Sequence, residues 1–198
     1  DGKKKVQVFD SPLHEWLPEW PKEDTVAVTS KAGAGDEGLL TLINTGTGKS
    51  EVVLSGVKGL TTLVNSDASR ILYSESSQSN LQNRVFKPAD KSSSFFPLTT
   101  LPEKCVWSKI KKNIIFCAVP NTLPNGNYPD SWYQGISSFH DELWKIDTDT
   151  GNADFIMNLG DQSREDFDAI NLSLNDKENF MLLTNKNNLT LWEVQLAP

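Results

Sequence analysis

The chain has 198 residues, of which 37% are hydrophobic, with a net charge of −7 at pH 7 and an isoelectric point near 4.9. This length is enough for one domain with a substantial core. The acidic balance argues against a nucleic-acid partner, because phosphate binding needs a basic surface. No apolar run approaches the roughly 20 residues that span a bilayer, so we expect a soluble segment without membrane insertion.

Two strand-like patterns recur along the chain. One covers residues 25–30, 70–74, 113–117 and 179–184, and the other follows it at 40–48, 84–90, 143–151 and 191–196. Self-similarity at about 40–50 residues, with about four strands in each period, is the signature of a β-propeller. Irregular spacing between the repeats indicates inserted loops.

The repeats predict an all-β propeller with four blade units of four antiparallel strands, at about 16–57, 59–99, 103–160 and 169–198. Residues 5–9 are expected as an extra outer strand. This strand either completes the fourth blade and closes a small ring, or belongs to a missing blade of a larger propeller. We favour the second interpretation, in which exposed blade edges would promote a homodimer.

Cys105 and Cys117 flank a predicted hairpin turn centred on Lys111. This register would place the two residues opposite each other on neighbouring strands, close to disulfide reach. We expect a disulfide if the protein is exported, and two small buried thiols otherwise. Two cysteines cannot form a structural zinc site, and His14 and His140 lack ligand spacing, so no metal or cofactor is expected.

The long loop at residues 121–139 is the strongest surface feature of the sequence. In a propeller it shares a face with residues 160–168, which join the third blade to the fourth. Aromatic rings beside charged groups suit a carbohydrate, peptide or cationic ligand. The candidate ligand-binding residues are therefore Tyr128, Asp130, Trp132, Tyr133, Arg164, Glu165, Asp166 and Asp168.

Two other interpretations of this loop remain open. Its aromatic side chains could pack down as a lid over the blades and bind nothing, which we favour. Alternatively, two of the four carboxylic acids could act as the acid and base of a glycan-active hydrolase, which depends on their separation in space. We found no nucleophile motif and expect no catalytic residues.

The segments 65–74 and 175–184 resemble the turn-then-strand repeat of TolB-type and WD-repeat-like bacterial propellers. Residues 101–108, 124–130 and 132–135 are similar to uncharacterised propeller proteins of uncultured small-genome bacteria, the candidate phyla. The resemblance implies an extracytoplasmic or membrane-anchored location and a longer full-length protein. It implies no established activity. We therefore expect a non-catalytic binding or scaffold propeller whose partner is a protein, peptide or glycan.

Overall fold

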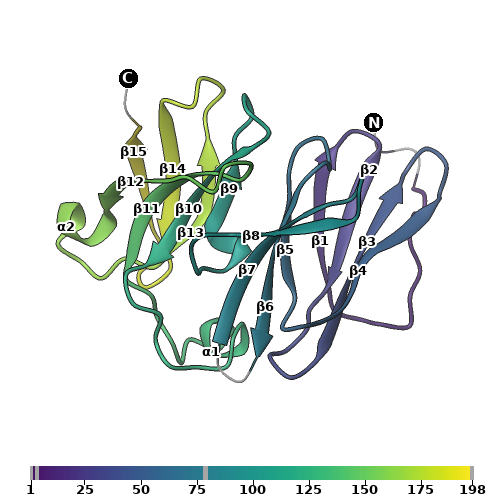
Figure 1. The fold of residues 1–198 in the computed structure, drawn as a ribbon, viewed down its shortest axis with the longest axis horizontal. Helices are drawn as coiled ribbons and strands as arrows, with labels where there is room; N and C mark the ends of the chain where they lie inside the picture. Colours follow the sequence, from purple (N-terminus) through teal and green to yellow (C-terminus); the bar gives the residue numbers. More distant parts are fainter. Residues whose placement is uncertain (1, 3–4, 78–79, 197–198) are drawn as a thin grey trace.

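The computed structural model describes residue 2, residues 5–77 and residues 80–196. Its strands form four antiparallel sheets that follow one another along the chain as the blades of a propeller (Figure 1). Helix accounts for only 5% of the chain, so the all-β prediction is confirmed. The two short helices are α1 (Asp130–Tyr133) and α2 (Leu159–Ser163).

Blades one and two are four-stranded sheets in which the strands pair in sequence order. Blade one contains β1 (Trp16–Lys22), β2 (Thr25–Ser30), β3 (Glu37–Asn44) and β4 (Ser50–Lys58). Blade two contains β5 (Thr61–Val64), β6 (Ile71–Ser77), β7 (Asn80–Lys87) and β8 (Ser92–Phe95).

Blade three also has four strands, whereas blade four has three within the described part of the chain. Blade three begins with the 3-10 turn η1 (Pro102–Lys104), followed by β9 (Cys105–Trp107), β10 (Ile114–Pro120), β11 (Asp141–Asp147) and β12 (Ala153–Asn158). Blade four contains β13 (Ala169–Leu174), β14 (Phe180–Asn185) and β15 (Thr190–Gln195).

Residues 5–9, expected as an extra outer strand, are not part of any strand. A lone segment cannot form strand structure without a partner ladder. The edge of β15 lies at the opposite end of the molecule from this segment (Figure 1). The ring closure that would pair residues 5–9 with blade four is therefore not observed.

The core is divided into hydrophobic clusters that lie between successive blades. The sequence of β10 explains how one strand serves two of them, because its side chains alternate between its two faces. Ile115, Cys117 and Val119 face blade two, whereas Ile114 and Phe116 face blade four. Every residue of β10 is consequently buried.

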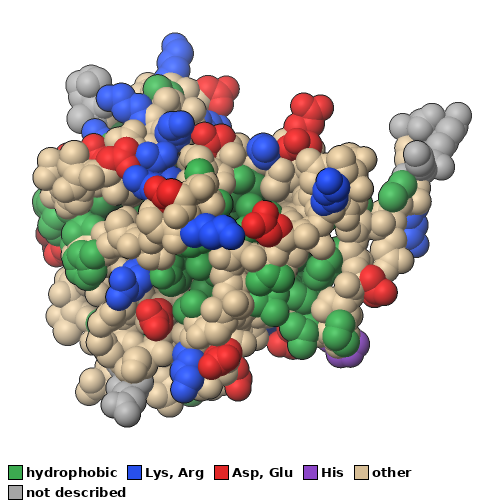
Figure 2. All heavy atoms as spheres, turned by 45° about the vertical axis from the view of Figure 1, so that its right-hand side comes forward, with side chains coloured by type: hydrophobic (Ala, Val, Ile, Leu, Met, Phe, Trp, Pro, Cys, Tyr) green, Lys and Arg blue, Asp and Glu red, His purple; other side chains and the backbone are tan. Residues whose placement is uncertain are grey.

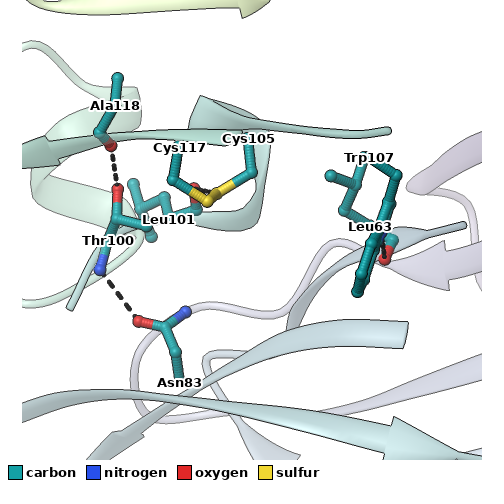
Figure 3. Close-up of a disulfide and its surroundings, with 8 residues drawn as sticks. All are labelled: Leu63, Asn83, Thr100, Leu101, Cys105, Trp107, Cys117 and Ala118. Carbon is teal, nitrogen blue, oxygen red and sulfur yellow. Dashed lines mark hydrogen bonds between the residues drawn. A yellow bond between two sulfur atoms is a disulfide. The ribbon is translucent and has the colours of Figure 1, made fainter. Parts of the chain in front are cut away.

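Cys105 and Cys117 lie directly opposite each other in the β9–β10 ladder, which confirms the predicted register. Their sulfur atoms are joined in a disulfide in the core between blades two and three (Figure 3). Beside it, the indole of Trp107 donates a hydrogen bond of 3.0 Å to the carbonyl of Leu63 on blade two. The disulfide therefore joins β9 and β10, the two inner strands of blade three, at the interface with blade two.

The disulfide generates a prediction about redox state and stability. Thiol labelling of the unfolded chain without reductant should find no free thiol. Substitution of both Cys105 and Cys117 by Ala should lower the free energy of unfolding by about 3 kcal/mol, because the cross-link no longer restricts a 12-residue separation in the unfolded chain. Reduced wild-type protein, measured in parallel by denaturant unfolding, should lose a similar amount. Two labels per chain would contradict the prediction.

Candidate functional site

The loop at residues 121–139, here called the lid, leaves blade three after β10 and returns to it at β11. α1 forms its middle and lies beside the ends of β6 and β7 (Figure 1). Gly59 allows this approach, since a Cβ atom there would lie 2.8 Å from the carbonyl oxygen of Tyr128. Its positive φ of 59° also favours glycine.

The lid connects its own blade to the three others. Each of these blades donates a hydrogen bond to it: Ala34 N–H of blade one to the carboxylate of Asp130 (2.6 Å), Ser76 Oγ of blade two to the carbonyl of Tyr128 (2.5 Å), and Lys186 Nζ of blade four to the carbonyl of Trp132 (2.9 Å). The lid thus provides polar contacts across the whole blade array.

The aromatic side chains of the lid point inward. Tyr128 and Trp132 are 1% and 4% exposed, and both pack against the buried ring of Phe139 at centroid distances of 5.6 and 6.2 Å. These rings form a hydrophobic cluster with Leu81 of blade two and Leu101. This is the packing expected of a loop that covers the blades as a lid. It removes two of the proposed ligand-binding rings, Tyr128 and Trp132, from the surface.

A buried ion cluster lies beneath the lid. The ammonium of Lys104 forms ion pairs with Asp168 and, at 2.7 Å, with Asp141, and it donates to the carbonyl of Ala169 at 2.8 Å. All three charged side chains are fully buried. Such a cluster is tolerated in a core only when its members are paired and hydrogen-bonded.

Asp168 also holds the lid in place. Its carboxylate accepts hydrogen bonds from the indole N–H of Trp132 at 2.9 Å and from the backbone N–H of Phe139 at 3.2 Å. The Lys104 ammonium lies 5.3 Å from the Trp132 ring centroid and 5.1 Å from that of Phe139, within the range of cation–π attraction. One carboxylate therefore couples blade three, blade four and the lid.

Asp141 is the other buried acid of the cluster. Burial raises the pKa of its carboxyl to about 6, although the neighbouring Lys104 ammonium opposes the rise. One of its oxygens accepts from Ala169 N–H at 2.6 Å, and the other, Oδ1, has no hydrogen-bond partner within the described residues. Asp141 is held by structural contacts and is not exposed to solvent.

The remaining predicted residues fall into two polar pockets on either side of the lid. Arg164, Glu165 and Asp166 come together between blades three and four, in a pocket of about 460 Å³. His140 lines the same pocket, and its Nδ1 lies 3.2 Å from the carboxylate of Asp166. We call this the inter-blade pocket.

The second pocket, of about 410 Å³, lies between the lid and blade one, and we call it the blade-one pocket. Asp130 and Tyr133 line it from the lid, opposite Lys31 and Asp36. The Lys31 ammonium lies 5.6 Å from the centroid of the Tyr133 ring. The eight predicted residues are thus divided between two pockets and the buried layer beneath the lid.

Sequence reasoning missed two further acids near the inner strands. The phenol of Tyr133 donates to Glu103 of η1, and burial raises the pKa of the Glu103 carboxyl. On β1, Glu19 accepts from the N–H of Val64 at 2.9 Å and from the hydroxyl of Thr62 at 3.2 Å. Burial raises the pKa of Glu19 to about 7, nearby Glu103 adds to the rise, and the two hydrogen bonds oppose it.

No sequence signal separated these acids from ordinary solvated ones. For the buried acids Asp141 and Asp168, Lys104 offers a clue, because it directly precedes the inner strand β9 and lies between Leu101 and Trp107. A charged group at such a position needs a buried partner. Its partners, Asp141 and Asp168, lie 37 and 64 residues further along the chain, too far for a sequence pattern to connect them to Lys104.

Among residues 5–77 and 80–196, no three or more His, Cys, Asp or Glu side chains are grouped so as to hold a metal ion. In the same part of the chain, no helix is long and apolar enough to cross a membrane.

Comparison with known proteins supports the fold alone. No protein-family model and no curated protein sequence matches the chain. Among solved structures, TolB from Acinetobacter baumannii superposes with a TM-score of 0.63 at 12% identity, over 98% of this chain and 47% of that one. The chain has the fold of a TolB-like β-propeller.

Two further structures show how widely this fold is shared. The β-propeller domain of the trilobed protease from Pyrococcus furiosus gives a TM-score of 0.55 at 11% identity, over 92% of this chain and 54% of that one. The GH74 xyloglucanase from Xanthomonas campestris gives 0.56 at 10% identity, over 88% and 26%. The chain therefore spans less than two thirds of the length of each. At these identities, function does not follow from fold.

The ion cluster predicts a large effect of removing its cation. Lys104→Met should lower the free energy of unfolding by about 3–5 kcal/mol, because it leaves two buried carboxylates facing each other. Adding Asp141→Asn to Lys104→Met should restore part of the loss. Lys109→Met removes an exposed ion pair with Asp176 and should cost less than about 1 kcal/mol. Equal losses for the two single variants, measured by denaturant unfolding, would contradict the prediction.

Glu19 predicts a pH dependence of stability. Its pKa is higher in the folded chain than in the unfolded one, so the folded state binds more protons between the two values. The contribution of Glu19 to the free energy of unfolding is complete below the pKa that this carboxyl has in the unfolded chain. It is lost as the pH rises through its folded pKa of about 7. From about pH 5 to about pH 8, wild type should lose about 1–3 kcal/mol relative to Glu19→Gln. The control Glu15→Gln, at an exposed position, should follow wild type. If the free energy of unfolding changed with pH in the same way for wild type and Glu19→Gln, the prediction would be wrong.

Proposed function

We propose that the chain is a non-catalytic binding or scaffold module of an exported propeller protein. Its binding surface is the lid face, by which we mean the lid together with the inter-blade pocket and the blade-one pocket. One observation supports this above the others. The aromatic and acidic groups at the centre of that face are used to attach the lid, since Trp132 and Asp168 are buried against each other. The other predicted polar side chains lie in the inter-blade pocket and the blade-one pocket.

The rival function, a glycan-active hydrolase, needs an acid and a base that a substrate can reach. Asp168 and Asp141 are fully buried and paired with Lys104. Asp130 accepts the N–H of Ala34 and lies on the other side of the lid from Glu165 and Asp166. A hydrolase would therefore have to use Glu165 and Asp166, which share the inter-blade pocket.

The inter-blade pocket is the part of the face best suited to a ligand. It offers the guanidinium of Arg164, the imidazole of His140 and the carboxylate of Asp166, together with the side chain of Asn121. Hydrogen-bond donors and acceptors line one concave surface, which suits the hydroxyl groups of a glycan or the polar backbone of a peptide. We assign this pocket the primary role in binding.

Export is supported by the chemistry of the two cysteines. Cys105 and Cys117 form a disulfide in the core, and structural disulfides persist in oxidising compartments. We therefore propose an extracytoplasmic location.

The binding proposal is tested on an array of glycans and peptides probed with the intact chain. Arg164→Ala combined with Asp166→Asn should reduce binding at least about tenfold, since each charge-assisted hydrogen bond contributes roughly 1.5–3 kcal/mol. Lys177→Ala is the matched control, because it removes an exposed charge from the β13–β14 turn at the other end of blade four. It should bind like wild type.

Two results would contradict the proposal. Binding that is unchanged in the double variant would exclude the inter-blade pocket. Release of reducing sugar from any arrayed glycan, abolished by Asp166→Asn, would establish the hydrolase instead. Circular dichroism of each variant separates loss of binding from loss of fold.

A further inference from the structure

Blade four has an open strand edge. Its described residues form a three-stranded sheet, whereas each of the other blades has four strands. β15 is its last strand, so the outward backbone N–H and C=O groups of that strand have no ladder partner among the described residues. An edge of this kind is a template for a further strand.

An apolar groove of about 370 Å³ adjoins this edge. Four residues of β15 line it, namely Trp192, Glu193, Val194 and Gln195. Trp192 and Val194 are half-buried and alternate along the strand with the exposed residues Leu191 and Glu193. The floor comes from both neighbouring blades and includes Met157, Leu159, Phe167 and Leu183. A strand added to β15 would extend the apolar surface of this groove if it carried apolar side chains at every second position.

Residues 5–9 carry that pattern and have no strand partner. Val6 and Val8 alternate with Lys5 and Gln7, and the two valines are 62% and 40% exposed. The segment stands away from the body of the molecule as an arm (Figure 2). A period of two with apolar residues left in solvent is typical of a strand whose sheet is absent.

The arm cannot reach β15 of its own chain. Phe9 packs edge-on against Trp16 at a centroid distance of 5.1 Å, which fixes the base of the arm beside blade one. Blade one and β15 lie at opposite ends of the molecule (Figure 1). Within one molecule, residues 5–9 therefore do not pair with β15.

We infer that residues 5–9 of one copy add to β15 of a second copy as the fourth strand of blade four, in a reciprocal dimer. Val6 and Val8 then face the groove beside Trp192 and Val194. Lys5 and Gln7 lie on the opposite face, where Glu193 complements the charge of Lys5. Each copy has one arm and one open edge, so a two-fold exchange satisfies both.

Light scattering of the full chain tests the dimer. Wild type should show twice the monomer mass over a concentration series. Val6→Asp combined with Val8→Asp should give a monomer, because two charges would enter the apolar groove. Gln7→Lys, which places a charge on the outward face of the same arm beside Glu193, should remain dimeric. A monomeric wild type, or a dimer that persists in the double variant, would overturn the inference.

Cross-linking tests the register and the exchange between copies. A Gln7→Cys chain mixed with a Glu193→Cys chain should form a covalent dimer under mild oxidation, and neither chain alone should do so. Cys105 and Cys117 do not compete, because they are already bonded to each other. Absence of the mixed dimer would exclude this pairing. Phe167 lines both the groove and the inter-blade pocket, but Arg164 and Asp166, the residues changed in the binding test, line only the pocket. Failure of the dimer and failure of the binding proposal are therefore distinguishable.

Discussion

The structure depends on one buried cation. The ammonium of Lys104 is fully removed from solvent, a costly placement that is stable only because Asp141 and Asp168 approach it closely. Asp141 belongs to blade three and Asp168 directly precedes blade four. The same Asp168 carboxylate accepts the indole N–H of Trp132 from the lid. Blade three, blade four and the lid are therefore oriented together, because a shift of any one would leave a charge unpaired in the core.

Hydrophobic contact and polar contact have separate roles in this architecture. Three hydrophobic clusters each join a blade to the next one along the chain, so these blades pack by contacts between sequence neighbours. The lid adds contacts of a different kind. The hydrogen bond from Ala34 to Asp130 spans 96 residues and connects blade one to an insertion in blade three. A few directional hydrogen bonds thus specify how segments far apart in the sequence are placed, while the hydrophobic effect stabilises the interfaces between successive blades.

The parts of the fold that could be predicted are those governed by local periodicity. The repeat along the chain identified β10, and antiparallel pairing placed Cys105 opposite Cys117, because one turn fixes the register of a hairpin. The candidate site was less predictable. Asp168 looked like a solvated loop acid, and only its distant partner Lys104 explains why it is buried. Residues 5–9 were assigned to a strand on alternation, which specifies an apolar face but not a partner.

The attachment of the lid determines where a ligand can bind. Because Tyr128 and Trp132 are buried in the core, these two rings cannot also stack on a sugar. Contact must then come from the rims, where Arg164 and His140 lie on one side of the lid and Lys31 on the other. Because the lid is already ordered by bonds to every blade, binding at either rim costs little loop entropy. Affinity there depends on how well a ligand matches fixed polar groups, which makes this face selective for shape and hydrogen-bond pattern.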